Sequence, residues 1–243
     1  MADPVYHGSG TLDYKGNTSF SSLSTTITNV EVGDLLVVQI QRNEQANITG
    51  VASVSPSLTF SRQIRANSNN SSDAFQHDIY TAIATSAAAS MTITASYSNS
   101  NRFGSMISYR WSGGISSGTA THSAADNDLR ATSTSRTATN ITTTQRTLLL
   151  ASGTEWNYYR THTAAANWTK ILDSQTNGTD STTMYLHARI ADAGTYPSGN
   201  FSTTNLTDQY FGSIIALPIE TGGAATSLPP NNSTMRYAHH LAR

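Results

Sequence analysis

The sequence predicts an all-β protein: an antiparallel β-sandwich of jelly-roll-like type, formed from two sequence-related halves with extended termini. Three observations predict this class. Apolar and polar residues alternate with a period of two, which is the repeat of a half-buried strand. The chain is rich in Ser, Thr and Asn and poor in charge, and its two halves carry the same short motifs in the same order.

The composition fits pleated strands. Of the 243 residues, 37% are hydrophobic and 12% are charged, against roughly 45–50% and 25% in an average globular domain. Disordered chains combine low hydrophobicity with high net charge, whereas the formal net charge here is -1. Thr-rich segments pack well in sheets. A pI near 6.6 provides no basic surface for nucleic acid, so no nucleic-acid partner is expected.

Targeting signals and disulfide bonds are not expected. The chain has no cysteine, hence no disulfide framework and no thiolate metal site. Residues 1–10 contain neither a basic nor an apolar signal region, so we expect no secretion signal and synthesis in the reducing cytoplasm. The longest apolar runs are far too short to span a bilayer, and no membrane partner is expected.

Alternation is clearest in two segments. Residues 75–83 place Phe75, Ile79 and Ile83 on one face, and residues 90–97 do the same with Met91 and the alternate residues that follow it. Clusters of Asn, Ser, Gly and Pro separate such runs and are typical of turns. No stretch of a dozen residues shows the 3.6-residue period of a helix.

The internal repeat organises the chain. Four motif pairs recur in the same order, and the most similar pair is Phe103-Gly104-Ser105-Met106-Ile107 and Phe211-Gly212-Ser213-Ile214-Ile215. We take residues 23–111 and 137–219 as two copies of one unit. One copy alone cannot cover its apolar face. We therefore expect one domain, residues 1–220, in which two sheets pack face to face, followed by an extended C-terminal arm, residues 221–243. Two separate units remain the alternative.

The glycines of the repeated motif also make a prediction. Gly104 and Gly212 stand within otherwise regular strands. Glycine at such a place marks a bulge or a close approach of another part of the chain.

Catalytic patterns are weak. Gly114, Ser116 and Gly118 match the Gly-x-Ser-x-Gly nucleophile pattern, but that motif needs a following helix, and a Thr-rich segment follows here. A two-carboxylate glycosidase needs a paired acid and base. Glu155 beside Trp156 is the best candidate, although a charge at the rim of a core explains it more simply. We expect no enzyme and no catalytic residues.

Metal and cofactor sites are not expected either. The acidic residues of Asp126-Asn127-Asp128 and of 173–180 lack the full ligand spacing of a calcium loop, and His239-His240 has no nearby carboxylate to orient a metal ligand. His77 and His187 occupy related strands and alternate with apolar neighbours. Both histidines are expected on the solvent side of their strands.

Two groups of residues suit partner contact. An aromatic cluster with an adjacent cation, which offers a large contact area at low entropy cost, consists of Trp156, Tyr158, Tyr159 and Arg160. Packing at the end of the sandwich is the alternative reading of that cluster. The C-terminal arm carries aromatic and basic residues suited to anchoring in an acidic groove, namely Arg236, Tyr237, His239 and Arg243. A disordered tail is the alternative there.

A family resemblance rests on an ordered set of motifs. Val32-Gly33-Asp34-Leu35-Leu36-Val37-Val38 is followed by the turn Phe60-Ser61, whose counterpart in the second copy is Trp168-Thr169, then by the strand 79–84 and by the segment 107–113. This order resembles β-sandwich modules of tailed-bacteriophage virion proteins and related bacterial surface proteins. The usual Gly-Trp turn of those modules is Thr-Phe in the first copy and Asn-Trp in the second. The resemblance implies a structural or adhesive role and brings no catalytic residues.

Three functions follow as hypotheses. The first is an exterior capsid decoration or cement protein of the virion, held by its termini on the major capsid protein or on other virion proteins, in a homo-oligomer for which trimers are plausible in such modules. The second is a tail-associated adhesin that binds host glycan through Trp156, Tyr158 and Tyr159. The third is a glycan-acting hydrolase that uses Glu155.

Overall fold

The computed structural model describes residues 3–16, 19–43, 47–67, 75–101, 103–126, 135–156, 163–175, 182–202 and 210–220. All regular secondary structure in these ranges is β-strand, and each strand pairs antiparallel with its neighbours. The predicted all-β, antiparallel sandwich class is confirmed. The predicted arm, 221–243, lies outside the described residues.

The N-terminal half forms two sheets. Its inner sheet, called the inner N-sheet, has the order β1 (Val5–Ser9), β10 (Gly104–Ser112), β4 (Leu35–Asn43), β8 (Phe75–Ile83) and β7 (Ser61–Asn67), and β2 (Asp13–Lys15) also pairs with β10. Its outer sheet, the outer N-sheet, has the order β3 (Phe20–Val30), β9 (Ala88–Asn101), β5 (Ile48–Val54) and β6 (Ser57–Thr59).

The C-terminal half repeats this plan. Its inner C-sheet has the order β11 (His122–Asp126), β17 (Tyr210–Pro218), β13 (Thr147–Trp156), β15 (Thr182–Ala191) and β14 (Thr169–Gln175). Its outer C-sheet pairs β12 (Ser135–Thr143) with β16 (Gly194–Ser202). The two inner sheets therefore place corresponding strands in the same order, with β10 matching β17, β4 matching β13 and β8 matching β15.

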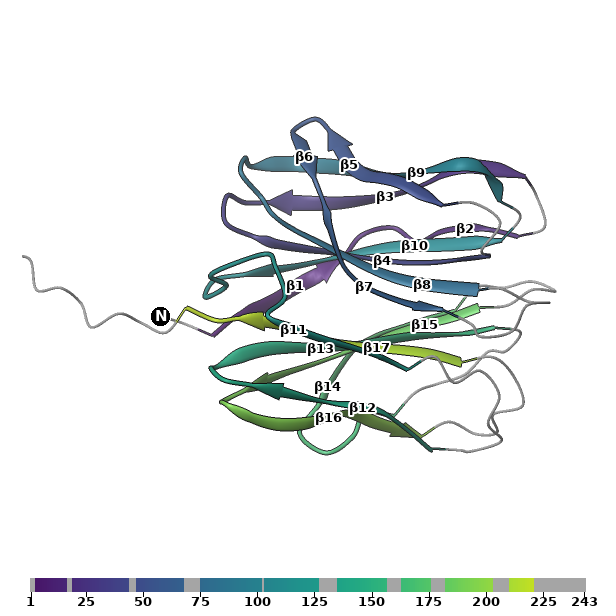
Figure 1. Ribbon diagram of the computed structural model, residues 1–243. Coiled ribbons are helices and arrows are strands. Elements are labelled where there is room, and N and C mark those ends of the chain that lie inside the picture. The colour runs from purple at the N-terminus through teal and green to yellow at the C-terminus, as the bar shows by residue number, and fades with distance from the viewer. Residues whose placement is uncertain are drawn as a thin grey trace, which may run out of the picture.

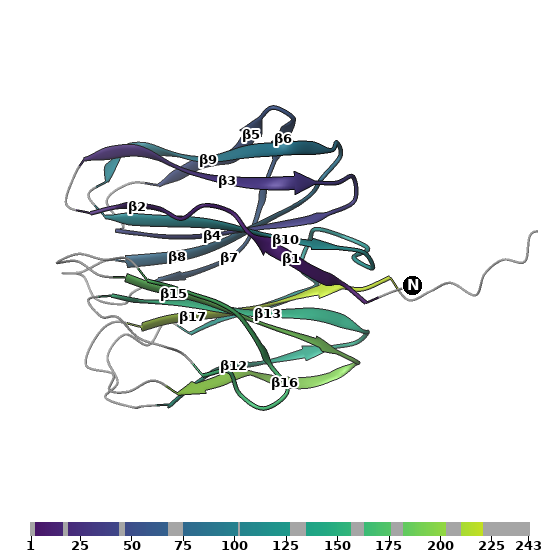
Figure 2. The same cartoon turned by 180° about the vertical axis from the view of Figure 1, so that it is seen from behind.

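The four sheets stack in layers, and Figures 1 and 2 show the layers edge-on from opposite sides. A first core lies between the outer and inner N-sheets and includes Leu36 and Ile93. A central core joins the two inner sheets and includes Val37 and Leu150, while a third core lies between the inner and outer C-sheets and includes Leu149. The side chains of adjacent residues in one strand thus pack into different cores.

This layering differs from the expected packing of one sheet from each half. Each half supplies two sheets, and the halves meet through their inner sheets. The physical reason lies in strands such as β4, where Leu35, Leu36, Val37 and Val38 are all fully buried. A strand that is apolar on both faces needs a covering layer on each side.

The Phe-Gly-Ser repeat marks corresponding positions. Gly104 begins β10 opposite Arg42 of β4, and Gly212 lies on β17 opposite Gly153 of β13. Gly104 confirms the predicted close approach, because a Cβ atom there would lie 2.8 Å from Cζ of Phe20 and 3.3 Å from a backbone oxygen. The two halves are therefore copies of one unit in structure as well as in sequence.

Candidate functional site

Both described chain ends lie on one side of the stack, at the ends of the strands, and we call this side the terminal face. It comprises Asp3, Glu220 and the turns at 31–34, 113–114, 144–146 and 192–194. The backbone N–H of Glu220 donates to the carbonyl oxygen of Gly114 at 2.7 Å, and that of Ile219 donates to Arg146 at 3.1 Å. The last described residues are therefore fixed by backbone hydrogen bonds to two turns.

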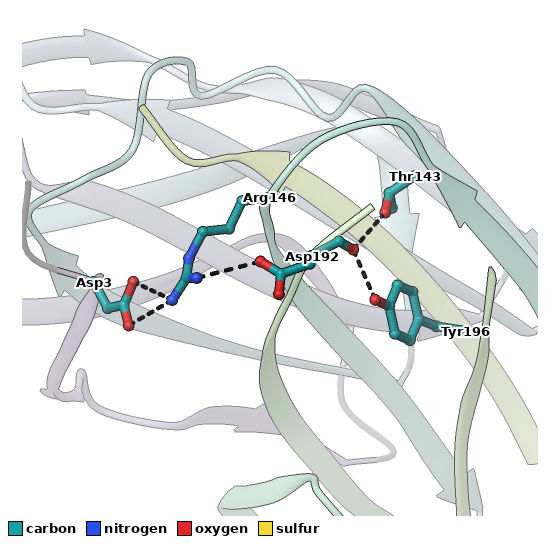
Figure 3. A network of polar contacts seen from close by, with 5 residues as sticks. All are labelled: Asp3, Thr143, Arg146, Asp192 and Tyr196. Carbon is teal, nitrogen blue, oxygen red and sulfur yellow. Dashed lines mark hydrogen bonds and ion pairs between the residues drawn. The ribbon is translucent and has the colours of Figure 1, made fainter. Parts of the chain in front are cut away.

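Arg146 connects the first described residue to this face. Its guanidinium donates to both carboxylate oxygens of Asp3, at 2.8 and 2.9 Å, and to Asp192 at 3.2 Å (Figure 3). The hydrogen bonds and charge of Asp3 raise the pKa of Arg146. Because all three side chains are well exposed, water screens the attraction and the gain in stability is small. The contacts nevertheless hold Asp3 in a defined place.

The network continues into the C-terminal half through the backbone of Asp192. The Asp192 carbonyl oxygen accepts hydrogen bonds from the hydroxyls of Tyr196 (2.7 Å) and Thr143 (3.2 Å) (Figure 3). The guanidinium carbon of Arg189 lies 4.8 Å from the centre of the Tyr196 ring, within the range of a cation–π contact. The turns at 144–146 and 192–194 are thereby tied to β12, β15 and β16.

The turn at 31–34 shows why the Val-Gly-Asp motif is structural. Gly33 has φ of 88°, a value that side chains disfavour, and its N–H donates to Ala84 at 2.8 Å. The buried carboxylate of Asp34 accepts from the N–H of Glu31 at 2.8 Å and from Arg110 at 3.2 Å. The motif therefore fixes a tight turn on the terminal face.

Charge on the terminal face is predominantly negative. In its described part, one exposed guanidinium, that of Arg146, is opposed by four exposed carboxylates, those of Asp3, Glu31, Asp192 and Glu220. Such a surface complements a basic partner surface, and complementary charge raises the association rate and fixes orientation.

A polar seam crosses the central core between the halves. Gln39 donates from Nε2 to the carbonyl oxygens of Gly153 (2.9 Å) and Tyr185 (3.3 Å), and its Oε1 accepts from the hydroxyl of Tyr109 at 2.8 Å. Oε1 of Gln41 accepts from the hydroxyl of Thr154 at 2.5 Å. These buried bonds fix the lateral register of one half on the other, since sliding would leave the groups unpaired.

The seam also contains a Ser–His pair. Nε2 of His77 lies 3.1 Å from Oγ of Ser152, which in turn lies 2.9 Å from Oγ of Ser213. A hydroxyl beside an imidazole is the unit of nucleophilic catalysis, but all three side chains are buried between the sheets. No substrate can reach the pair in this conformation, and its role here is structural.

The predicted solvent-side placement of the two histidines is wrong. His77 and His187 are both 0% exposed. They lie on β8 and β15, which are interior strands of the inner sheets and are covered on both faces. Burial lowers the pKa of His77 to about 3. Alternation with apolar residues cannot distinguish a solvent face from a second core.

A buried ion cluster occupies the first core. Asp78 pairs with Arg65 at 2.8 Å and with Arg42 at 3.7 Å, and the side chains of Arg42 and Asp78 are fully buried. Burial lowers the pKa of Arg42, and the charge of Asp78 opposes that shift. Burial also raises the pKa of Tyr97, whose ring lies 6.0 Å from the Arg42 guanidinium carbon. The alternating pattern of β8 predicted none of these contacts.

The residues singled out for partner contact remain untested. Trp156 ends β13, and its side chain lies outside the described part, as do Tyr158, Tyr159 and Arg160. The arm residues Arg236, Tyr237, His239 and Arg243 also lie outside it. The same holds for the side chain of Glu155 and for those of Asp126 and Asp173.

The serine of the Gly-x-Ser-x-Gly pattern has a structural contact. Oγ of Ser116 donates to the carbonyl oxygen of Pro218 at 3.1 Å, and the segment leads into strand β11 instead of a helix. Among the described residues, no group of three His, Asp or Glu side chains could hold a metal ion. None of these residues forms a helix long and apolar enough to cross a membrane.

No family model, no curated protein and no solved structure was found to match the chain.

Proposed function

We propose that the protein is a structural component of a tailed-phage virion, an exterior capsid decoration protein that attaches through its terminal face. The observation that carries the proposal is the meeting of Asp3 and Glu220 on one face, where Arg146 and the turn at 113–114 hold both chain ends. Attachment by the termini requires that both ends point toward the same partner.

The stacked sheets support the role of a rigid structural or displayed component. The body has three successive cores, and its two inner sheets cannot slide on one another without breaking the buried hydrogen bonds of the seam. The outer N-sheet contains no Asp, Glu, Lys or Arg in its four strands. Its exposed hydroxyls pair across strands, as in Thr26 with Thr92 at 3.2 Å and Ser24 with Thr94 at 3.0 Å, which gives a neutral polar outer surface.

The partner surface is proposed to be basic. The exposed carboxylates of Glu31, Asp192 and Glu220 outnumber the Arg146 guanidinium on the terminal face. Charge reversal at Glu31 and Glu220 should therefore weaken attachment, whereas an added positive charge on the outer N-sheet should not.

The test is an add-back experiment with particles of the phage that encodes the protein, prepared without it. Quantitative mass spectrometry measures copies bound per particle for the full chain, a chain ending at Glu220, the double variant E31K/E220K and the control Ser96→Lys. We expect many copies of the full chain and of the control, and strongly reduced binding of the other two. Absence from native particles, or equal binding of all four proteins, would refute the proposal.

A further inference from the structure

Two glutamine side chains of β4 reach across to the other half of the molecule, and their amide groups are paired very differently. Both polar atoms of the Gln39 amide have partners, because Nε2 donates to two carbonyl oxygens and Oε1 accepts from the hydroxyl of Tyr109. Gln41 is 2% exposed, and its Nε2 has no hydrogen-bond partner within the described part of the chain. A buried N–H group without a partner destabilises the folded protein.

Two hydroxyl groups converge on the carbonyl group of the same side chain. Oγ1 of Thr154, on β13 of the other half, lies 2.5 Å from Oε1 of Gln41, and Oγ of Ser105 lies 3.3 Å from it. The Ser105 hydroxyl also contacts Sδ of Met184 at 3.0 Å. Because a C=O bond is about 1.23 Å long, Oγ1 of Thr154 lies at most about 3.7 Å from the amide carbon. Reacting atoms that are about 3–3.5 Å apart are in near-attack geometry.

An imidazole lies beside these groups. His77 is the direct cross-strand partner of Gln41, an arrangement that brings two Cβ atoms to about 4.5–5.5 Å. Its Nε2 contacts Oγ of Ser152, which lies two residues before Thr154 on the same face of β13. Its Nδ1 has no hydrogen-bond partner among the described residues. Burial lowers the pKa of His77 to about 3, so the ring is neutral near pH 7 and can accept a proton.

We propose that Thr154 and Gln41 form an ester bond within one chain, which links the two inner sheets covalently. Oγ1 of Thr154 attacks the amide carbon of Gln41, and the C–N bond breaks as the new C–O bond forms. The hydroxyl proton passes through the imidazole of His77 to the departing nitrogen, which leaves as ammonia. One hydroxyl and one primary amide thus become one ester and one ammonia, and no oxidant, reductant or water is consumed.

The closed core suits this reaction, because both reactants belong to the chain. Groups that are held in contact react with effective molarities of up to about 10⁵–10⁸ M. Ser105 is placed to donate to Oε1, where negative charge develops during the attack. Ammonia that reaches the solvent takes up a proton there, while the dry core protects the ester from hydrolysis. The reaction also removes the unpaired N–H groups of Gln41.

Mass spectrometry of the isolated full-length protein tests the proposal without any particle. The intact mass should be lower by one ammonia than the mass of the unmodified sequence. Tryptic digestion should yield a linked pair of peptides, 16–42 and 147–160, whose fragments place the bond at Gln41 and Thr154 and not at Gln39. Alkaline hydroxylamine, which cleaves esters, should separate the purified pair. Recovery of the two peptides only in their unlinked form would overturn the proposal.

Variants of the nucleophile distinguish the ester from other losses of ammonia. Thr154→Val removes the hydroxyl at nearly unchanged volume and should abolish the linked pair, whereas Thr154→Ser keeps a hydroxyl and should retain it. Ring closure at Asn177-Gly178 also releases ammonia, but it links no peptides. A loss of ammonia that persists in Thr154→Val and is never accompanied by linked peptides in the wild type would contradict the ester. None of these outcomes depends on whether the protein decorates a capsid.

Discussion

Replacement of His77 by glutamine is expected to remove a source of acid destabilisation from the central core. Burial lowers the pKa of His77 from 6.5 to about 3. The unfolded chain therefore binds a proton on His77 below pH of about 6.5, and the folded protein does not until about pH 3. Stability is complete above the unfolded pKa and falls as the pH drops through this window.

The size of the effect follows from the shift. Each unit between the two pKa values corresponds to about 1.4 kcal/mol. Near pH 4.5, two units below the pKa of the unfolded state, burial of His77 should have lowered the free energy of unfolding of the wild type by about 3 kcal/mol. At neutral pH the glutamine variant should be the less stable protein by about 1–2 kcal/mol, since it loses fitted packing in the core. Acidification should narrow or reverse that difference.

Urea unfolding followed by tryptophan fluorescence, from pH 8 to pH 4.5, measures the free energies of unfolding of the wild type and of His77→Gln. Ser152→Ala is the informative control, because it removes the His77 hydrogen bond at 3.1 Å but leaves the imidazole buried. It should lower stability and retain the acid loss. If the difference in free energy of unfolding between the wild type and His77→Gln stays constant from pH 8 to pH 4.5, burial of His77 is not the cause of the acid loss.

Three further substitutions test the packing. Gln39→Ala removes the side-chain bridge across the seam and leaves a cavity between the inner sheets, so unfolding experiments should show a loss of about 3 kcal/mol. The exposed control Gln145→Ala should change stability by less than about 0.5 kcal/mol. Asp78→Asn should cost about 3–5 kcal/mol in the same assay, because Arg42 stays buried without its counter-charge; a near-neutral result would contradict the ion cluster. Gly104→Ala should lower the thermal midpoint through a cost of about 1–3 kcal/mol, while Gly50→Ala, with no atom within 4 Å of the added Cβ, should not.

The sequence pattern predicted the strands and their duplication because both depend on local signals. Met91, Ile93, Ala95 and Tyr97 alternate with polar residues, and all four are buried on the inner face of β9. Conversely, alternation fails on interior strands, where polar residues such as His77 face a second core. The number of layers was therefore not predictable from the period alone.

The correspondence of residues between the two copies was also not predictable from the apolar runs alone. Ser105 lies opposite Gln41, and Ser213 lies opposite Ser152. Val38 therefore corresponds to Leu149, whereas comparison of the apolar runs alone pairs Leu35 with Leu149. A shift of three residues, an odd number, exchanges the two faces of a strand. A run that is buried on both faces contains no mark of its register, and the glycine of the Phe-Gly-Ser motif provides it.

The contacts of the terminal face and the seam depend on tertiary structure. Asp3 and Arg146 meet although 143 positions separate them, and Gln39 reaches Gly153 over 114 positions. Motifs found by spacing along the chain cannot detect such partners. The Val-Gly-Asp motif was detectable because its contacts are local, although its role is to make a turn.

The matching strand orders of the inner sheets have a consequence for the origin of the chain. Two identical subunits that associate about a twofold axis use the same surface patch on both partners. Here the patch is the inner sheet of each half, so tandem joining of the subunits of such a dimer would produce this architecture directly. Once the subunits are covalently linked, the two copies can mutate independently. Gln41 of the first copy and Ser152 of the second therefore occupy corresponding positions at the interface between the halves, although they are different residues.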